Sequence, residues 1–361
     1  MINTTITHII ATVTVILLFL FMLYLLSNKK RSLRHSLLAI FFLANGLYLI
    51  DYLLNPIQRV LGISLAWFDE VGFSFAFLFG PLILFFIRSI LTQKLELKLN
   101  MIWHIIPFIF FFIVYIISDN IFCEYGYIIL FIQLFIYYAL ALNDLILYRS
   151  KAKLFLSNLA DVNLNWVVYV LIAFIMTSLI DFTSAILAFF HLDNATTRAN
   201  LNFFSVLINF SYVVYIFYNL LNLPELSFEN NDSFHAEKYT ASKLTQEMKA
   251  RIVQKVEDYF SNEKPYINPA LTINDISQAL EIPMRDISQV INESLNKNFY
   301  DFTNSYRINE AKAYLTNEAH HKETILEILY KSGFNSKSSF NTAFKKNTGQ
   351  TPSQYRQSKR F

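Results

Sequence analysis

Seven apolar stretches occupy most of the first 223 residues of this chain. A helix that crosses a lipid bilayer needs about 20 predominantly apolar residues, and each stretch is close to that length. The sequence therefore predicts that residues 1–223 fold as a polytopic bundle of seven transmembrane helices. The predicted spans cover approximately residues 7–26, 36–54, 67–91, 101–118, 123–148, 165–190 and 201–223.

Charged residues are distributed very unevenly along the chain. Lys, Arg, Asp and Glu make up 22 of residues 1–223 but 35 of residues 224–361. The first part has the composition of a membrane protein, and the second has that of a soluble domain. This contrast excludes a purely soluble enzyme and a disordered protein. The lone cysteine, Cys123, excludes an intramolecular disulfide and a zinc cluster built on cysteines.

The basic residues between the spans indicate the orientation of the chain. Three alternate loops carry ten Lys and Arg residues, whereas the loops between them carry only Arg59 and Arg198. Because basic loops face the cytoplasm, we expect the N-terminus outside and the chain from residue 224 onward inside. The ten residues are Lys29, Lys30, Arg31, Arg34, Arg88, Lys94, Lys98, Arg149, Lys151 and Lys153.

A polar segment, residues 224–244, follows the last predicted span and has no clear hydrophobic period. It begins with Pro224, which lacks the backbone N–H that a continuing helix needs. We therefore predict a cytoplasmic linker over residues 224–244.

Short blocks of helical periodicity fill the remainder, residues 245–361, and the period of two that strands require is absent. We predict a small all-helical domain here, so the fold class of the whole chain is all-α. The predicted helices cover about 245–261, 272–280, 283–294, 299–317, 324–331, 336–347 and 352–359.

Two helix pairs in this domain share one plan. In each pair a short helix is followed by a tight turn and by a second helix with apolar residues at i and i+4. Gly333 suits the second turn because glycine adopts positive φ without strain, and Pro283 suits the first position of a helix. This is the plan of the helix-turn-helix, whose second helix lies in the DNA major groove. The inward pairs are Ile276 with Leu280, Ile287 with Ile291, Ile325 with Leu329, and Phe340 with Phe344.

The last 110 or so residues resemble the DNA-binding domain of AraC-type transcription regulators. The most specific part is the segment ILEILYKSGFNSKSSFNTAFKKNTGQTPSQYR, which is similar to the signature of that family. The connecting helix is similar too, through Arg307, Glu310-Ala311-Lys312 and Leu315. The resemblance implies two helix-turn-helix units, binding to double-stranded DNA and a role in bacterial transcription. It also implies that one chain places two recognition helices on DNA, so a homodimer stays an open alternative.

Residues on the outer faces of the two recognition helices are the candidates for DNA contact. Arg, Asn and Gln side chains can form paired hydrogen bonds with guanine or adenine edges, and Lys and Arg hold phosphates. The candidates for base edges are Arg285, Ser288, Gln289, Asn292, Asn335, Ser336, Lys337, Ser338, Asn341 and Thr342. The candidates for phosphates are Lys345, Lys346 and Arg356.

Acidic and polar residues within the spans are candidates for a ligand-sensing site, because such groups usually face a protein interior or a water-filled cavity. Thr177, Asp181 and Ser184 form one polar stripe in the sixth span. Asn202, Ser205, Asn209 and Tyr212 form another in the seventh span. We predict an extracytoplasmic-facing pocket for a small polar or cationic ligand. The candidate residues are Asp51, Asp69, Glu70, Asp181 and Asn209.

Taken together, these features predict a one-component transcription regulator in the bacterial cytoplasmic membrane. Its partners are double-stranded DNA, the lipid bilayer and a small ligand, and no cofactor or metal site is expected. Catalytic motifs such as HExxH or a phosphate-binding loop are absent from the sequence. Two alternatives stay open. One is a transporter or lipid-modifying membrane enzyme that carries a regulatory domain, and the other is a docking module that does not bind DNA.

Overall fold

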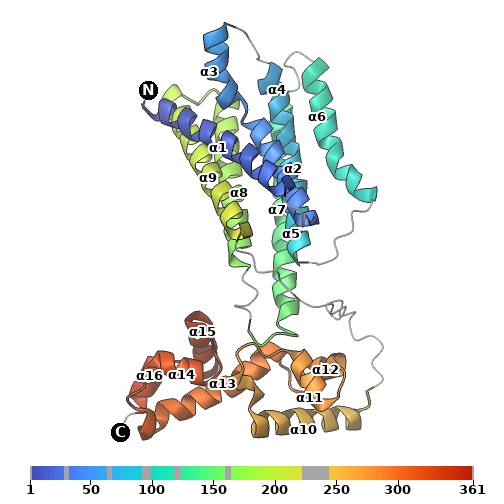
Figure 1. The fold of residues 1–361 in the computed structure, drawn as a ribbon, viewed down its shortest axis with the longest axis vertical. Helices are drawn as coiled ribbons and strands as arrows, with labels where there is room; N and C mark the ends of the chain where they lie inside the picture. The colour runs from blue at the N-terminus through green and yellow to red at the C-terminus, as the bar shows by residue number, and fades with distance from the viewer. Residues whose placement is uncertain are drawn as a thin grey trace. The chain divides into compact units, whose positions relative to one another are not determined.

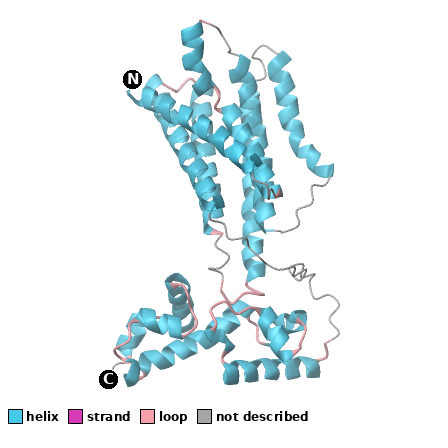
Figure 2. Cartoon of the chain, viewed as in Figure 1, coloured by secondary structure: helices cyan, strands magenta, loops and turns pink. Residues whose placement is uncertain are grey.

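The computed structural model describes residues 2–27, 32–62, 67–91, 99–117, 123–158, 164–221 and 244–359. Within these ranges the backbone is helical, apart from turns and one isolated antiparallel bridge between Leu156 and Thr272 (Figures 1 and 2). The predicted all-α class is confirmed. The chain divides into two compact units: Met1–Ile146 with Leu164–Leu226, and Leu147–Asn163 with Ser227–Phe361. The predicted linker, 224–244, lies almost wholly outside the described residues.

The helices of the first unit are strongly apolar. Five of them are long and apolar enough to cross a membrane, over residues 4–27, 71–91, 126–152, 165–189 and 195–219. They correspond to the first, third, fifth, sixth and seventh predicted spans. The bounds in this unit are α1 Ile2–Ser27, α2 Leu33–Tyr48, α3 Asp51–Leu61, α4 Trp67–Ser74, η1 Phe75–Leu78, α5 Phe79–Leu91, η2 Leu99–Ile105, α6 Ile106–Ile117, α7 Cys123–Ala152, α8 Asn165–Phe189 and α9 Ala195–Leu221. The end of α7, from Leu147 onward, belongs to the second unit.

Two of the seven predicted spans are shorter than a full membrane crossing. The fourth is an apolar helix of fewer than 18 residues over Met101–Ile117, and the second, α2, ends at Tyr48. The prediction that one helix covers residues 36–54 is wrong, because Leu49 and Ile50 form a turn and Asp51 begins the separate helix α3. A carboxylate in the first turn of a helix interacts favourably with the helix dipole. The total of seven spans therefore stays a prediction.

The seven predicted helices of residues 245–361 begin and end within two residues of the predicted bounds. They are α10 Gln246–Glu263, α11 Ile273–Leu280, α12 Met284–Ser294, α13 Phe299–Thr316, α14 Ile325–Lys331, α15 Lys337–Thr348 and α16 Pro352–Ser358. Two short 3-10 helices that were not predicted, η4 Pro265–Ile267 and η5 Glu318–His320, lie between them.

The second unit contains two hydrophobic cores, which share α13. The first core gathers side chains of α10, α11 and α12, including Phe260, Ile276 and Ile287. The second gathers side chains of α14 and α15, including Phe340 and Phe344. The N-terminal half of α13 contributes to the first core and its C-terminal half to the second. Each helix-turn-helix pair therefore has its own core, and α13 connects the two.

Residues 153–158, which follow α7 directly, also belong to the second unit. We call this segment the docking strand. Phe155 is 8% exposed and is part of the first core. Leu156 pairs with Thr272 in the antiparallel bridge, immediately before α11. A segment that sequence analysis assigns to a loop between two spans thus completes the core of the helical domain.

Candidate nucleic-acid interface and candidate ligand cavity

The second helix-turn-helix unit consists of α14 and α15. Thr324 caps α14 in a capping box with Glu327, and the Ser336 hydroxyl accepts a hydrogen bond from the Ser339 N–H at the start of α15. Between the helices, Gly333 has a φ of +87°, as the sequence predicts for this turn. The local sequence therefore fixes both the start of the second helix and the sharp turn before it.

The inward side of α15 is fully packed, which leaves its other side for contacts with a partner. Phe340 and Phe344 are completely buried, as predicted. Asn341 is partly exposed, and Thr342 is exposed. These two positions lie outside the buried stripe of α15, so they stay candidates for base contact. The exposed or half-exposed candidates on or just before α15 are Asn335, Ser336, Lys337, Ser338, Asn341, Thr342 and Lys345.

Two of the three predicted phosphate ligands already have partners within the domain. The Lys346 ammonium lies 2.8 Å from a carboxylate oxygen of Asp301. The Arg356 guanidinium donates a hydrogen bond of 2.7 Å to the Glu323 carbonyl oxygen and is partly buried. Lys345 and Lys346 are both exposed, but Lys346 and Arg356 have these partners within the domain. Lys345 is therefore the strongest of the three candidates for a phosphate contact.

The first helix-turn-helix unit consists of α11 and α12. Thr272 and Asp275 form the capping box of α11, and the turn after it places the non-glycine residue Glu281 at a φ of +54°. Pro283 is the N-cap residue of α12 and not its first helical residue, so the predicted position is off by one. The apolar pair Ile287 and Ile291 is buried as expected.

Two predicted base contacts on α12 do not face outward. Ser288 and Gln289 are only 3% and 2% exposed. The Gln289 amide donates hydrogen bonds of 3.1 Å to the Glu293 carboxylate. The reason is that α12 packs against α10 as well as α11 and α13, so less of its circumference is free than in an isolated helix pair. Arg285 is exposed and Asn292 is partly exposed, and these two remain candidates.

Arg307, in the middle of α13, is 1% exposed and connects three parts of the domain. Its guanidinium donates hydrogen bonds to the carbonyl oxygens of Tyr266 (2.7 Å), Asn268 (2.8 Å) and Ser157 (3.0 Å). The central carbon of the guanidinium also lies 5.6 Å from the centre of the Phe334 ring, in the turn of the second helix-turn-helix unit. Sequence reasoning marked Arg307 as a family position, but its contact with Ser157 had no signal in the sequence.

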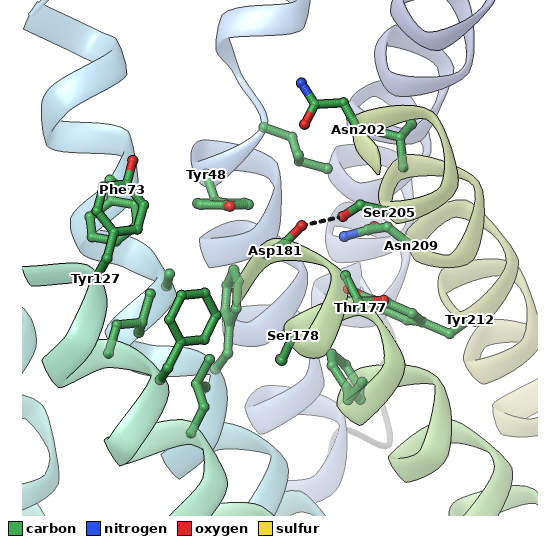
Figure 3. A pocket seen from close by; sticks show the side chains of 18 of the residues that line it. Tyr48, Phe73, Tyr127, Thr177, Ser178, Asp181, Asn202, Ser205, Asn209 and Tyr212 are labelled. Atoms are coloured by element: carbon green, nitrogen blue, oxygen red, sulfur yellow. Dashed lines mark hydrogen bonds between the residues drawn. The ribbon is translucent and has the colours of Figure 1, made fainter. Parts of the chain in front are cut away.

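The first compact unit contains a cavity of about 270 Å³ lined by side chains from α2, α7, α8 and α9, among others. Figure 3 shows Asp181 on α8 directed toward Ser205 on α9. The Ser205 hydroxyl donates a hydrogen bond of 2.7 Å to the Asp181 carboxylate. The polar side chains in the lining are Tyr48, Tyr52, Tyr127, Tyr138, Thr177, Ser178, Asp181, Asn202, Ser205, Asn209 and Tyr212.

Hydrogen bonds hold several of these polar groups in place. The Tyr138 and Ser178 hydroxyls lie 2.9 Å apart, and the buried Asn45 amide donates a bond of 3.0 Å to the Tyr212 hydroxyl. Aromatic rings, including those of Phe73 and Phe174, complete the wall. The cavity therefore combines one carboxylate with many aromatic faces.

The predicted polar stripes of the sixth and seventh spans converge on this cavity. Thr177 and Asp181 from one stripe and Asn202, Ser205, Asn209 and Tyr212 from the other all line it. Ser184 and Asp51 are not among the lining residues. Asp69 and Glu70 lie in the first turn of α4, and their side chains fall outside the described part of the chain. Four other lining tyrosines, Tyr48, Tyr52, Tyr127 and Tyr138, were missed, because their spacing does not separate them from aromatic residues that face lipid.

Among the residues that the structure describes, no three His, Cys, Asp or Glu side chains lie close enough together to hold a metal ion.

Comparisons with known proteins bear on the second unit. A family described as a helix-turn-helix domain matches residues 276–358. An uncharacterized HTH-type transcriptional regulator of Staphylococcus aureus strain COL is 29% identical over 185 residues, which cover 46% of this chain and 22% of the relative. Another, from strain MSSA476, is 30% identical over 192 residues, which cover 48% and 23%. The chain thus spans less than a quarter of the length of these curated relatives.

No solved structure matches the chain. The family match runs from Ile276 in α11 to Ser358 at the end of α16. It covers the second helix-turn-helix unit completely and most of the first. It includes Gly333, the buried pair Phe340 and Phe344, and the buried Arg307. Residues 276–358 therefore form a helix-turn-helix domain of the AraC type, the family that the sequence resembles.

Proposed function

We propose that this protein is a membrane-embedded, one-component transcription regulator. The observation that carries the proposal is the combination, in one chain, of a domain with two helix-turn-helix units and five helices with the length and hydropathy of membrane spans. Such a chain binds promoter DNA from the membrane without a separate signalling partner.

Exposed polar and basic side chains of both units form the proposed DNA interface. Bases are read by hydrogen-bonding side chains in the major groove, and phosphates are held by cations. The buried Ser288 and Gln289 are left out of this interface. The proposed contacts are Arg285, Asn292, Asn335, Ser336, Lys337, Ser338, Asn341, Thr342 and Lys345, with Lys346 and Arg356 at the edge.

Large apolar side chains on the outer faces of the helices support membrane embedding. Ile9 is 58% exposed, Ile132 57% and Ile172 49%. Exposed apolar side chains are unfavourable in water and favourable against lipid tails. We propose that these faces contact the acyl chains of the bacterial cytoplasmic membrane.

The docking strand supports the proposed orientation independently of the basic loops. It packs into the DNA-binding domain, so the end of α7 lies on the same side of the membrane as that domain. Two predicted spans, α8 and α9, separate it from residue 224, and an even number of crossings returns the chain to the same side. The docking strand thus agrees with the loop charges that the end of α7 and the C-terminal domain share one side, and the basic loops assign that side to the cytoplasm.

The cavity around Asp181 is the proposed sensing site. Aromatic faces attract cations, and a carboxylate at the same place adds a charge-assisted contact. The proposed signal is therefore a small organic cation or a small polar molecule. Because α8 and α9 both line the cavity, its occupation favours one arrangement of these helices through differential affinity.

A genome-wide map of DNA bound by the full-length protein in its host tests the regulatory function. Footprinting of the purified protein on the occupied promoters identifies the operator. We expect discrete promoter sites whose occupancy falls steeply with salt. An absence of specific DNA sites would support the docking-module alternative, and substrate accumulation in vesicles that carry the protein would support the transporter alternative. Hydrodynamic measurement of the protein on its operator distinguishes a monomer from a homodimer.

A further inference from the structure

We propose that the docking strand, residues 153–158, attaches the DNA-binding domain to helix α7 independently of the linker. The second part of the proposal is that this attachment transmits changes at the cavity to the DNA-binding domain, and this part rests on the proposed sensing function. The partner surface is the segment from Tyr266 to Ile273 together with Arg307 of α13. The occupant is a segment of the same chain.

Backbone hydrogen bonds hold the docking strand along the entry to α11. The Ser157 N–H donates to the Leu271 carbonyl (3.2 Å), and the Ile273 N–H donates to the Phe155 carbonyl (3.0 Å). A third bond runs from the Tyr300 N–H, at the start of α13, to the Lys153 carbonyl (3.0 Å). The docking strand therefore contacts α11 and α13 through its backbone, with Leu156 in the isolated antiparallel bridge.

The side chains on either side of Leu156, those of Phe155 and Ser157, hold the same segment in place. The Ser157 hydroxyl donates to the Leu271 carbonyl at 2.5 Å and accepts from Arg307 at 3.0 Å. Phe155 inserts into the first core, beside residues of α10 and α11. A buried arginine needs acceptors for its N–H groups, and the docking strand supplies two of those that Arg307 uses. The strand is thus built into the domain.

Helix α7 connects the docking strand to the cavity without a break. Leu130, Leu134 and Tyr138 of α7 line the cavity, and the same helix continues to Ala152, one residue before the strand begins. The chain itself joins residues 221 and 244, so docking is intramolecular and the effective concentration of the two partners is of the order of millimolar. A docked strand is therefore maintained even by a modest affinity.

Disulfide trapping tests the attachment. Leu156 and Thr272 form a non-hydrogen-bonded antiparallel pair, whose Cα atoms lie about 4.5 Å apart, which is within the range for a disulfide. The full-length protein would carry Leu156→Cys and Thr272→Cys in a Cys123→Ser background, with a protease site within residues 224–244. After oxidation in native membranes and cleavage, we expect the two fragments to remain joined on a non-reducing gel and to separate on reduction.

The matched control replaces Thr272→Cys with Thr324→Cys. Thr324 caps α14 through the same type of capping box, so both variants lose an equivalent cap. We expect little crosslinking in the control, and we expect Phe155→Ala to lower the crosslinked fraction of the Leu156–Thr272 pair. Equal crosslinking of both pairs, or none in the Leu156–Thr272 pair, would overturn the attachment. This assay needs neither DNA nor ligand, so its failure is separate from a failure of the proposed function.

Substitution of a cavity residue on α7 tests the transmission. Leu134→Trp fills part of the cavity, whereas Leu140→Trp alters the same helix at a side chain that is 41% exposed. We expect Leu134→Trp, but not Leu140→Trp, to change promoter occupancy at equal membrane abundance. The change should disappear when Ser157→Pro removes the N–H that bonds Leu271. No change from Leu134→Trp, or a change that persists with Ser157→Pro, would overturn the transmission.

Discussion

A Cβ atom on Gly333 would overlap the carbonyl oxygen of Tyr266 and lie 2.9 Å from the Cα atom of Ile267. The turn between α14 and α15 therefore packs directly on the backbone of η4. This contact, together with the position of Arg307 next to Phe334, packs the second helix-turn-helix unit against η4 and α13.

Gly333→Ala should strongly destabilise the second helix-turn-helix unit, α14 and α15. The new methyl group meets backbone atoms that cannot rotate away, and the φ of +87° adds strain of about 1–3 kcal/mol. Gly349→Ala is the control, because Gly349 has a similar φ of +75° but no atom within 4 Å of the added Cβ. Hydrogen exchange of the α14 and α15 amides should accelerate much more in the first variant than in the second. Equal acceleration would mean that backbone conformation alone is responsible.

Arg307→Lys should destabilise the DNA-binding domain even though it keeps the charge. A lysine cannot replace a guanidinium that bonds several carbonyl oxygens in different directions. Each buried group left without a partner costs about 1–3 kcal/mol. Arg251→Lys serves as the comparison, because the Arg251 side chain is 74% exposed and pairs with Glu247 on the same helix. Pulse proteolysis of the full-length protein in urea measures both, and a loss no larger than that of the control would contradict the role of Arg307.

Gln289→Ala should lower stability without changing base preference. The side chain is 2% exposed and donates to Glu293, so its removal costs about 1–2 kcal/mol, as is usual for a buried hydrogen-bonding residue. Binding to a panel of operator variants should keep the same ranking as in the parent protein. A relaxed preference at one base position with unchanged stability would restore Gln289 as a base contact.

Lys345→Ala and Asn341→Ala should weaken DNA binding in different ways. Loss of a phosphate contact weakens all sequences alike and reduces the slope of log affinity against log salt by about one unit. Loss of a base contact costs about 1–3 kcal/mol at one position of the operator. Lys322→Ala, at an exposed residue before α14, is the charge-matched control. Salt titrations with the parent operator and its single-base variants separate these effects, and a Lys345→Ala loss confined to one base would contradict the assignment.

Asp181→Asn should blunt the transcriptional response while leaving the helices packed. The asparagine keeps the shape and an oxygen that accepts from Ser205, but it removes the charge that a cation would need. A charge-assisted hydrogen bond contributes about 1.5–3 kcal/mol, so affinity for a cationic signal should fall at least about tenfold. Asp193→Asn, whose side chain pairs with Arg198, is the control. A reporter under an occupied promoter that responds equally in the parent and in Asp181→Asn would reject the charged site.

Local features of the DNA-binding domain could be predicted from the sequence. Helical periodicity and the positive φ of Gly333 depend on neighbouring residues, and they appear as expected. The burial of Gln289 could not be predicted in the same way. It depends on the packing of α12 against α10, and the i and i+4 pattern of Ile287 and Ile291 describes only one face of the helix.

The candidate cavity was predictable only in part. The stripes that contain Asp181 and Asn209 are visible because polar groups are rare in apolar helices. Tyr48 and Tyr127 gave no comparable signal, since tyrosine is common both at membrane interfaces and in packed helices. The docking strand was not predictable at all, because Ser157 and Arg307 are 150 positions apart and no local pattern links them.

The origin of Phe155 has a consequence for the biosynthesis of the chain. The ribosome makes Phe155 before α8 and α9, but it makes the other side chains of that hydrophobic core after them. The core therefore cannot close until the two intervening apolar helices have been synthesised and have left the ribosome. Completion of the first core of the helix-turn-helix domain is thus coupled to the synthesis of these two helices, and a chain that stops before them cannot bury Phe155.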